Sequence, residues 1–382
     1  MNESIFKSIK NLPPLDDTIT QIQQICHDEN ANMSDLIAVI KRDPMLTANI
    51  LHSANSPLYG FSREISDVSQ AVNLFGMATI RGFALYGAIK HSFKMDLSPY
   101  NIDGTKFLDI VGTQSILIFD WYAKVNRSAL NVLSPSSFLM EIGKIVVAKE
   151  LIEGKKADEF KSKLANINTI EELSQLESQL VGSNSEEITA QILEQWHFEE
   201  EIVQSIKYLN RISQAPKEIK NYAIALNAAK TSVNVLNKFK PENIQSALNF
   251  VEKNGLDKDK FALALKKVQE AWENFILKTF LQGLSKGIDA SLNTENKELL
   301  RILESLKAIS KYHNKFYLNN NFVIGKLDIS QNATGYLNAY DERFKKDLLI
   351  QNRDLNAAHL GDIVLAKILK SKKDRVYAKI LA

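Results

Sequence analysis

Histidine and cysteine are the side chains best suited to bind a metal or attack a substrate, and this sequence has few of either. The six histidines form no His-x-x-x-His pair, so we expect solvated or hydrogen-bonded side chains rather than metal ligands. The single cysteine, Cys26, is followed by His27, but neighbours on a helix point about 100° apart, which argues against a catalytic dyad. One cysteine also excludes an internal disulfide and favours a reducing compartment. The histidines are His27, His52, His91, His197, His313 and His359.

Phosphate-binding and membrane signals are also missing. The pair Gly143-Lys144 resembles the end of a P-loop, but Phe138 stands where its first glycine belongs, and no G-x-G-x-x-G occurs. The N-terminus has no apolar core of a signal peptide, and no stretch approaches the roughly 18 apolar residues that span a bilayer. We therefore expect a cytoplasmic protein with no cofactor and no membrane association.

Charge is distributed unevenly along the chain. Residues 295–382 hold 16 of the 47 Lys and Arg and 10 of the 45 Asp and Glu, a balance of +6, which leaves 31 against 35, or −4, for the rest. A basic tail on a mildly acidic body is typical of a polyanion-binding appendage, although most surface lysines only keep a protein soluble.

Apolar spacing predicts a long helical region, which would carry Cys26 and most of the histidines. Between residues 19 and 281, apolar residues recur every three or four positions, and Gly and Pro mostly separate the runs. Asp43 followed by Pro44 marks a helix start, because Asp caps free N–H groups and Pro fits the first helical position. The apolar run after residue 69 is interpreted as one buried helix, in which Gly76 and Gly82 permit close packing.

The pattern changes after Asn319. Five short β-prone runs, separated by turns rich in Asn, Asp, Gly and Lys, predict a small five-stranded barrel over residues 319–382. A helix with a leucine stripe lies in the preceding stretch, so 286–318 is interpreted as a helical connector.

Three ordered segments identify the first part of the chain as similar to HDOD domains. They are NLPPL (11–15), IKRDPMLTANILHSANSPLYGF (40–61) and ISDVSQAVNLFGMATIRGFAL (65–85). The resemblance covers roughly residues 1–285. It implies an all-α body with an N-terminal half over about 1–95 and a degenerate HD-like half over about 100–285, and it implies a role in bacterial signal transduction.

HDOD domains resemble HD phosphohydrolases, in which His and Asp side chains bind a metal that activates water. In the segment FLMEIGKIVVA, Met140 and Glu141 stand where an active enzyme has His-Asp, and Met is a poor ligand for a hard divalent ion. The other aligned positions are also substituted, so the resemblance implies a protein without HD-type hydrolysis. They carry Gln114, Ser185, Leu226 and Lys230.

The C-terminal part resembles the N-terminal OB or cold-shock-like region of ribonuclease R. The resemblance rests on Gly325, the run Gly335-Tyr336-Leu337, the run 347–350 and the run 359–362. Such barrels bind single-stranded RNA by stacking bases on aromatic rings while cations contact the phosphates. The catalytic domain of that family is absent from this sequence, so no exonuclease activity is expected. Fusion, truncation and a joined reading frame all remain open as origins of the junction near residue 285.

The resemblance gives candidate RNA-binding residues on the barrel. They are the rings of Tyr336 and Tyr340 with the cations of Lys326, Arg343, Lys345 and Lys346. The alternative is that about half of the barrel's aromatic residues only fill its interior. Those are Phe322, Tyr336, Tyr340, Phe344 and Tyr377.

The sequence thus predicts a non-catalytic regulatory protein. Its helical body would bind a signalling protein or a small effector, and its barrel would bind single-stranded RNA. Two alternatives stay open: a ribonuclease-accessory RNA-binding protein and a divergent HD-type metal-dependent phosphohydrolase.

Overall fold

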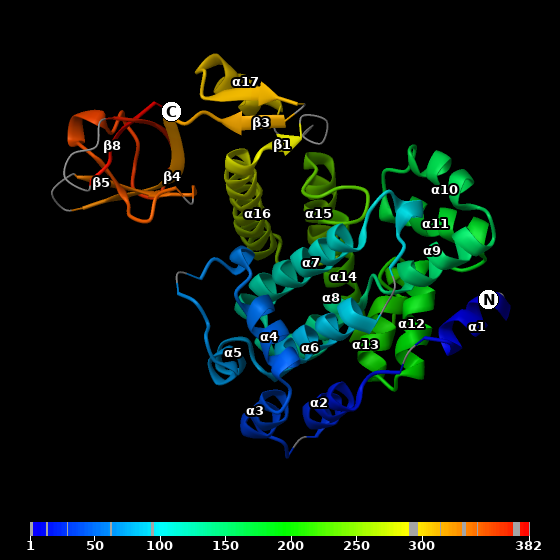
Figure 1. Ribbon diagram of the computed structural model, residues 1–382. Helices are drawn as coiled ribbons and strands as arrows, with labels where there is room; N and C mark the ends of the chain where they lie inside the picture. The colour runs from blue at the N-terminus through cyan, green and yellow to red at the C-terminus, as the bar shows by residue number, and fades with distance from the viewer. Residues whose placement is uncertain are drawn as a thin grey trace. The chain divides into compact units, whose positions relative to one another are not determined.

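The protein is described by a computed structural model covering residues 3–12, 14–28, 30–61, 63–92, 95–289, 297–313, 315–330, 334–341, 343–369 and 375–381. The side chains of Lys90, His91, Ser92, Ser285, Asp289, Lys297 and Glu298 lie outside the described part. The chain divides into two compact units, Met1–Trp272 and Glu273–Ala382 (Figure 1). The boundary lies inside one helix, so the predicted boundary at 285 falls within the second unit.

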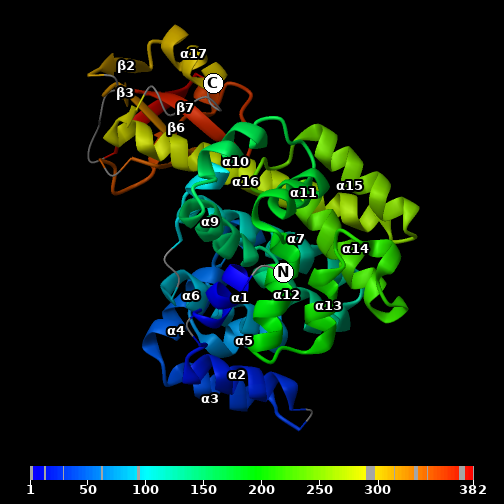
Figure 2. The same ribbon diagram turned by 90° about the vertical axis from the view of Figure 1, so that its right-hand side faces the viewer.

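Unit 1 is built from helices, as the apolar spacing predicts. Figure 2 shows α2 and α3 at one end of this unit and α10 and α11 toward the other. The first helices are α1 (Glu3–Lys10), α2 (Asp17–His27), α3 (Met33–Lys41), α4 (Pro44–Ala54), α5 (Val68–Phe75) and α6 (Met77–Ser92). The later ones are α7 (Gly104–Val125), α8 (Leu130–Leu139), α9 (Gly143–Glu153), α10 (Ala157–Leu164), α11 (Ile170–Val181), α12 (Ser185–Gln195), α13 (Glu200–Lys207), α14 (Lys217–Ser232), α15 (Pro241–Lys253) and α16 (Lys258–Lys286), which continues into unit 2. Short 3-10 turns are η1 (Pro57–Tyr59), η2 (Ser98–Tyr100), η3 (Arg127–Ala129) and η4 (Ile212–Gln214).

Local sequence signals set several helix ends. Asp43 caps α4 by accepting hydrogen bonds from the backbone of Met45 and Leu46, with Pro44 as the first residue, which confirms the predicted start. The single helix predicted after residue 69 is wrong. The chain breaks at Gly76, whose φ is +82°, and α5 and α6 meet at a bend of 120°. A left-handed φ favours glycine, so Gly76 ends a helix.

The second glycine of this run does serve packing. A Cβ added to Gly82 would lie 2.4 Å from Cδ2 of Phe138 on α8. Gly82 therefore allows α6 to approach α8 closely, as the sequence predicts.

Gly143, the first residue of α9, allows a similar approach to α12. A Cβ there would lie 2.1 Å from the carbonyl oxygen of Ser185 and 2.7 Å from Oγ1 of Thr189. The backbone N–H of Gly143 donates to that same Oγ1 over 2.9 Å. Residue 143 is thus held against the helix that carries Ser185.

We expect Gly143→Ala to lower the free energy of unfolding by about 1–3 kcal/mol, because the added methyl overpacks a backbone contact. Gly112, inside α7, is the matched control, since nothing lies within 4 Å of a Cβ built there. Gly112→Ala should raise stability by about 0.5–1 kcal/mol, because glycine is unfavourable in a helix interior. Urea unfolding followed by circular dichroism measures both, and equal effects of the same sign would contradict the packing argument.

One stretch of unit 1 is more apolar than the sequence analysis expects. Among the described residues, Arg127–Glu153 is long and apolar enough to cross a membrane, and the bent pair Val68–Phe75 and Met77–Ile89 passes the same test together. The most apolar window of Arg127–Glu153 is 83% buried inside the protein. The core helices of folded proteins show the same composition.

Unit 2 contains a small sheet, a helix and a barrel. The sheet has the strand order β1-β3-β2, and the strands β4-β5-β6-β8-β7 close into a barrel, which confirms the five-stranded barrel prediction. All pairs are antiparallel except β6 with β8. The elements are β1 (Ile288–Asp289), α17 (Lys297–Ser305), β2 (Ile309–Tyr312), β3 (Lys315–Leu318), β4 (Phe322–Ile329), β5 (Gly335–Ala339), β6 (Leu348–Ile350), η5 (Asn352–Asp354), β7 (Ile363–Ile368) and β8 (Tyr377–Ile380).

The predicted helical connector over 286–318 is only partly helical. Its leucine-striped helix is α17, but β1, β2 and β3 occupy much of the rest. Leu300 and Leu303 of α17 pack in one cluster with Phe316 of β3 and Phe322 of β4. This segment is therefore part of a packed core in unit 2.

Candidate functional site

Four of the six substituted HD positions meet in one buried polar network. Nε2 of Gln114 on α7 donates over 2.8 Å to Oε1 of Glu141, which follows α8. Nζ of Lys230 on α14 lies 3.3 Å from Oε2 of Glu141. Ser185, at the start of α12, joins through Nζ of Lys144, which donates to Oγ of Ser185 over 2.8 Å. Positions far apart in the sequence therefore converge in the centre of the helical body.

The other two positions do not join this network. Met140 and Leu226 are fully buried members of the hydrophobic core. Four of the six positions are therefore in polar contact, and the remaining two pack in the hydrophobic core.

The centre of the network is an ion-pair cluster formed by Glu141, Lys144, Glu177, Glu186 and Lys230. Lys144 Nζ lies 3.3 Å from Glu141 Oε2 and 3.3 Å from Glu177 Oε1, and Lys230 Nζ lies 2.6 Å from Glu186 Oε1. Each of these side chains is at most 3% exposed. Glu141 Oε2 lies between both ammonium groups. Two positive and three negative charges give the cluster a formal charge of −1.

The cluster favours the ionised form of two of its carboxylates, Glu141 and Glu186. Burial would raise the pKa of Glu186, but the ammonium groups of Lys230 and Lys144 outweigh it and lower this pKa to about 2. The pKa of Glu141 is lowered in the same way, against burial, by Lys230 and Lys144. Burial opposes the charge of Lys144, yet the glutamates raise its pKa above the ordinary value. The charges of Glu141, Glu186 and Lys144 thus depend on their partners.

Three members of the cluster are absent from the predicted positions: Lys144, Glu177 and Glu186. Lys144 could have been found, because Lys144 and Glu141 are the two charged residues in the otherwise apolar run 138–148. Glu177 sits among Gln and Ser residues on α11, and nothing in its local sequence indicates burial. The hydroxyl of Tyr100 donates to Oε1 of Glu177 over 2.8 Å, and the backbone N–H of Ser185 donates to its Oε2 over 2.7 Å.

These residues do not fit a divalent metal. The carboxylates that converge here are compensated by lysine ammonium groups, which repel a second cation at the same place. In the described ranges, no three His, Cys, Asp or Glu side chains are grouped so that they could hold a metal ion. The predicted HD-ligand positions that meet here therefore form an internal ion-pair network.

Cys26 is held in an environment that disfavours its thiolate. Its Sγ donates to the carbonyl oxygen of Met77 over 3.8 Å, and burial raises the pKa of the thiol to about 11. The thiol is therefore protonated near neutral pH, which does not suit a nucleophile.

One pattern of hydrolase chemistry does occur in the sequence. Residues Gly283 to Gly287 have the G-x-S-x-G spacing of a nucleophile elbow. Such an elbow needs a strand that turns sharply into a helix. Here the pattern lies at the end of α16 and precedes β1, which is the reverse order. The backbone at Ser285 therefore lacks the elbow arrangement.

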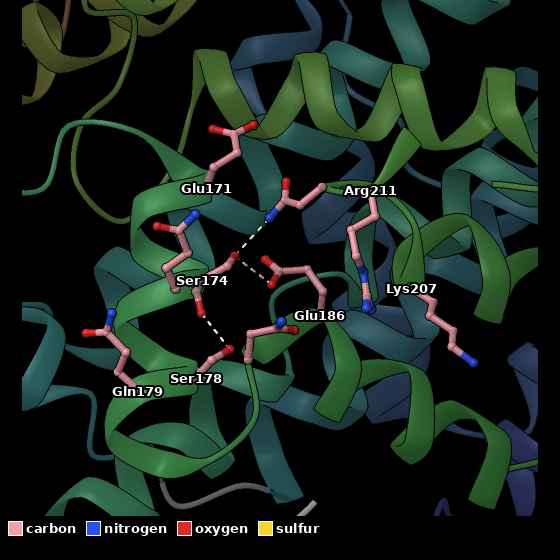
Figure 3. A pocket seen from close by; sticks show the side chains of 10 residues that line it. Glu171, Ser174, Ser178, Gln179, Glu186, Lys207 and Arg211 are labelled. Carbon is pink, nitrogen blue, oxygen red and sulfur yellow. Dashed lines mark hydrogen bonds between the residues drawn. The ribbon is translucent and has the colours of Figure 1, made fainter. Parts of the chain in front are cut away.

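A pocket of about 490 Å³ lies beside the ion-pair cluster, where α11, α12 and the end of α13 meet (Figure 3). Glu186 belongs both to the pocket lining and to the ion-pair cluster. Its Oε2 accepts a hydrogen bond from Oγ of Ser174 over 2.8 Å, and its Oε1 contacts Lys230. Oγ of Ser174 also accepts from Nδ2 of Asn210 over 2.8 Å. A hydrogen-bonded chain thus joins the pocket to the cluster. The lining residues are Glu171, Ser174, Gln175, Ser178, Gln179, Asn184, Glu186, Lys207, Asn210 and Arg211.

The barrel in unit 2 exposes a row of side chains on its outer face. Tyr336 of β5 is 38% exposed and pairs with Leu349 of β6, which in turn pairs with Tyr377 of β8. Directly paired residues point to the same side of a sheet, so two tyrosines flank a leucine in a tyrosine row. Lys379, two residues after Tyr377, pairs with Lys367 of β7, and both are exposed.

Other predicted RNA-binding residues have different surroundings. Lys326, Lys345 and Lys346 are exposed. Arg343 donates to Asp341, Asn320 and the carbonyl oxygen of Phe322, so its guanidinium is occupied inside the protein. Tyr340 is half-buried against the apolar cluster of unit 2, with Nζ of Lys278 5.4 Å from its ring centre. Geometry therefore favours Tyr336 and the lysines over Arg343 and Tyr340.

The interior-filling alternative holds for part of the aromatic set. Phe344 packs against the barrel core, whereas Phe322 is buried in the cluster formed with Leu300 and Leu303 of α17 and not in the barrel interior. Tyr336 is on the outer face, and Tyr377 is half-buried on the other side of Leu349 in the same row. Tyr377 is a candidate that the sequence analysis counted only among possible interior residues.

Comparison with known proteins gives two family matches. The HDOD domain model matches residues 12–212, and the model of the N-terminal first OB domain of ribonuclease R matches residues 279–379. A curated protein of Treponema pallidum without an assigned function is 19% identical over an aligned length of 231 residues, and the match covers 57% of this chain and 41% of that protein. The chain thus spans about two fifths of that relative.

Solved structures share the fold of the helical body. A protein of Shewanella amazonensis provisionally assigned as a phosphohydrolase matches with a TM-score of 0.55 at 19% identity, covering 70% of this chain and 95% of that one. A protein of Marinobacter aquaeolei provisionally assigned to signal transduction matches with a TM-score of 0.51 at 23% identity, covering 72% and 59%. With its ordered N-terminal motifs, its helical body and a family match over more than half of its length, this chain belongs to the HDOD domain family.

Proposed function

We propose that this protein is a regulator that acts by binding rather than by catalysis. The observation that carries the proposal is the ion-pair cluster, in which Lys144 and Lys230 compensate the carboxylate of Glu141, the one acidic residue at a predicted HD-ligand position. The helical body would then be a platform for a signalling protein or a small effector in the cytoplasm. A fold shared with a protein provisionally assigned to signal transduction supports this choice.

Metal analysis tests the non-catalytic part of the proposal. The protein purified without chelators should contain substoichiometric iron, manganese and zinc, because the ammonium groups of the cluster disfavour a further cation. Stoichiometric iron or manganese would instead support the HD-type hydrolase alternative. Affinity purification of the full chain from its source cells tests the platform, and recovery of no partner above background would count against it.

The barrel is proposed to bind single-stranded RNA through its outer face. Tyrosine rings can stack on bases, and lysines can contact phosphates. The tyrosine row and the exposed pair Lys367 and Lys379 place both kinds of side chain on neighbouring strands. Binding should weaken as salt rises, because phosphate contacts release counterions.

We expect Tyr336→Ala to weaken binding of a fluorescent single-stranded RNA by about 1–3 kcal/mol, the range measured for lost base stacking. Tyr312→Ala is the matched control, since Tyr312 is 66% exposed but lies on β2, outside the barrel. Fluorescence anisotropy of the full chain at two salt concentrations measures both variants. Equal affinities of the wild type and Tyr336→Ala would contradict the assignment of this face.

A second candidate is a ribonuclease-accessory RNA-binding protein, in which the helical body only carries the barrel. The match of residues 279–379 to the first OB domain of ribonuclease R favours it. Deletion of residues 319–382 separates the two, because the accessory role requires the barrel while the platform role can persist without it.

A further inference from the structure

The pocket beside the ion-pair cluster is lined by polar residues alone. Its volume of about 490 Å³ lies within the range of small-molecule sites, which is roughly 300–1,000 Å³. Such sites are usually lined by apolar and aromatic side chains. A pocket without an aromatic ring offers no stacking surface for a nucleobase, whereas side chains of Ser, Gln and Asn can bond hydroxyl groups through both donors and acceptors.

The hydrogen-bonding groups and the positive charges lie on different sides of this pocket. Ser178 and Gln179 come from α11, whereas Lys207 and Arg211 come from the end of α13 and the residues after it (Figure 3). Among the described residues, Lys207 forms no ion pair. Arg211 forms an ion pair with Glu187, with 2.9 Å between Nη2 and Oε1. In Figure 3 the ammonium group of Lys207 extends away from Ser174, Ser178 and Gln179, so Lys207 lies at the rim of the pocket and would turn inward to contact an anion.

The acidic residues of the lining do not cancel this charge. Glu186 is 3% exposed, and its carboxylate is compensated by Lys230, which does not line the pocket. Glu171 is exposed, and in Figure 3 its carboxylate points away from Ser174 and Ser178. The pocket thus combines a neutral wall of hydroxyl and amide groups with a cationic wall.

We infer that this pocket binds a small phosphorylated sugar or polyol. Its hydroxyl groups would bond Ser178, Gln175 and Gln179, and its phosphate would contact Lys207 and Arg211, since charged hydrogen bonds to phosphate are the strong ones. The inference rests on the proposed function and names the chemical class of its small effector. Because Ser174 joins the pocket to Glu186, a bound ligand would also restrain the cluster and stabilise the helical body.

Calorimetric titration of the full chain with glucose 6-phosphate, glucose and inorganic phosphate tests the inference. We expect glucose 6-phosphate to bind more tightly than either of the others and to raise the melting temperature. Lys207→Gln should weaken its binding by about ten- to a hundredfold, the effect of losing one charged hydrogen bond. Lys220→Gln is the matched control, because Lys220 is exposed on α14 and does not line the pocket.

Gln179→Ala gives a second, independent measurement at an exposed position of α11. This variant should weaken the binding of glucose 6-phosphate while leaving the affinity for inorganic phosphate unchanged. Binding of inorganic phosphate as tight as that of the sugar phosphate, equal losses in Lys207→Gln and Lys220→Gln, or no binding of any probe would each overturn the inference. These failures leave the RNA and metal measurements unaffected, so they are distinguishable from failure of the proposed function.

Discussion

Replacing Lys230 with Met is expected to lower the free energy of unfolding by about 3–5 kcal/mol, the usual effect of removing one partner from a buried ion pair. Lys230 Nζ lies 2.6 Å from Glu186 Oε1 and 3.3 Å from Glu141 Oε2, and the Lys side chain is 1% exposed. Without it, the cluster would hold three carboxylates and one ammonium group. Urea unfolding followed by circular dichroism measures the loss.

Two further variants make this experiment specific. Lys220→Met changes the same residue type on the exposed face of the same helix, and it should change stability by less than about 0.5 kcal/mol. The double variant Lys230→Met with Glu186→Gln should be less destabilised than the sum of the single variants, because the unpaired carboxylate has been removed. Additive effects would show that Lys230 and Glu186 do not depend on each other.

The second large effect is a loss of stability in acid. Glu186 has a folded pKa of about 2, against an ordinary value of 4.5. A lowered folded pKa contributes stability that is fully present above pH 4.5 and is lost as the pH falls toward 2, because the unfolded chain binds the proton first. Glu141, whose pKa is also lowered, acts in the same direction. For Glu186 alone, the difference between its folded and unfolded pKa corresponds to about 3 kcal/mol of unfolding free energy.

Glu186→Gln isolates this contribution. The variant cannot lose the Glu186 charge in acid, so the stability difference between it and the wild type should shrink by about 2 kcal/mol between pH 5 and pH 2.5. Urea unfolding at a series of pH values gives the two curves. Parallel curves would mean that Glu186 does not titrate differently in the folded and unfolded chains.

Much of the fold can be predicted from the sequence because its signals are local. Asp43 and Pro44 specify a helix start through a cap and a fixed φ, and alternation with turn residues specifies the barrel strands. The break at Gly76 could not be predicted from apolar periodicity, because that periodicity continues through the glycine. Only its left-handed φ distinguishes Gly76 from Gly82, which lies inside a helix.

The candidate site is less predictable, because burial of a charge depends on distant partners. The resemblance to HD enzymes predicts that Glu141 and Lys230 are substituted positions, but it does not predict that they compensate each other. Glu177 and Glu186 lie on helices with ordinary polar residues, and only the packing of α9, α11, α12 and α14 buries them. Tyr377 likewise joins Tyr336 only through the parallel pairing of β6 and β8.

The order in which the ion-pair cluster is translated has a consequence for folding on the ribosome. Glu141, Glu177 and Glu186 are all synthesised before Lys230, so a nascent chain that has not yet released α14 holds the carboxylates with only Lys144 to compensate them. Domains fold as units during synthesis, and the helical body can complete its interior only once α14 has emerged. The family match ends at residue 212, before that helix. We therefore expect a fragment of the body that ends at residue 212 to fold less stably than one that includes α14.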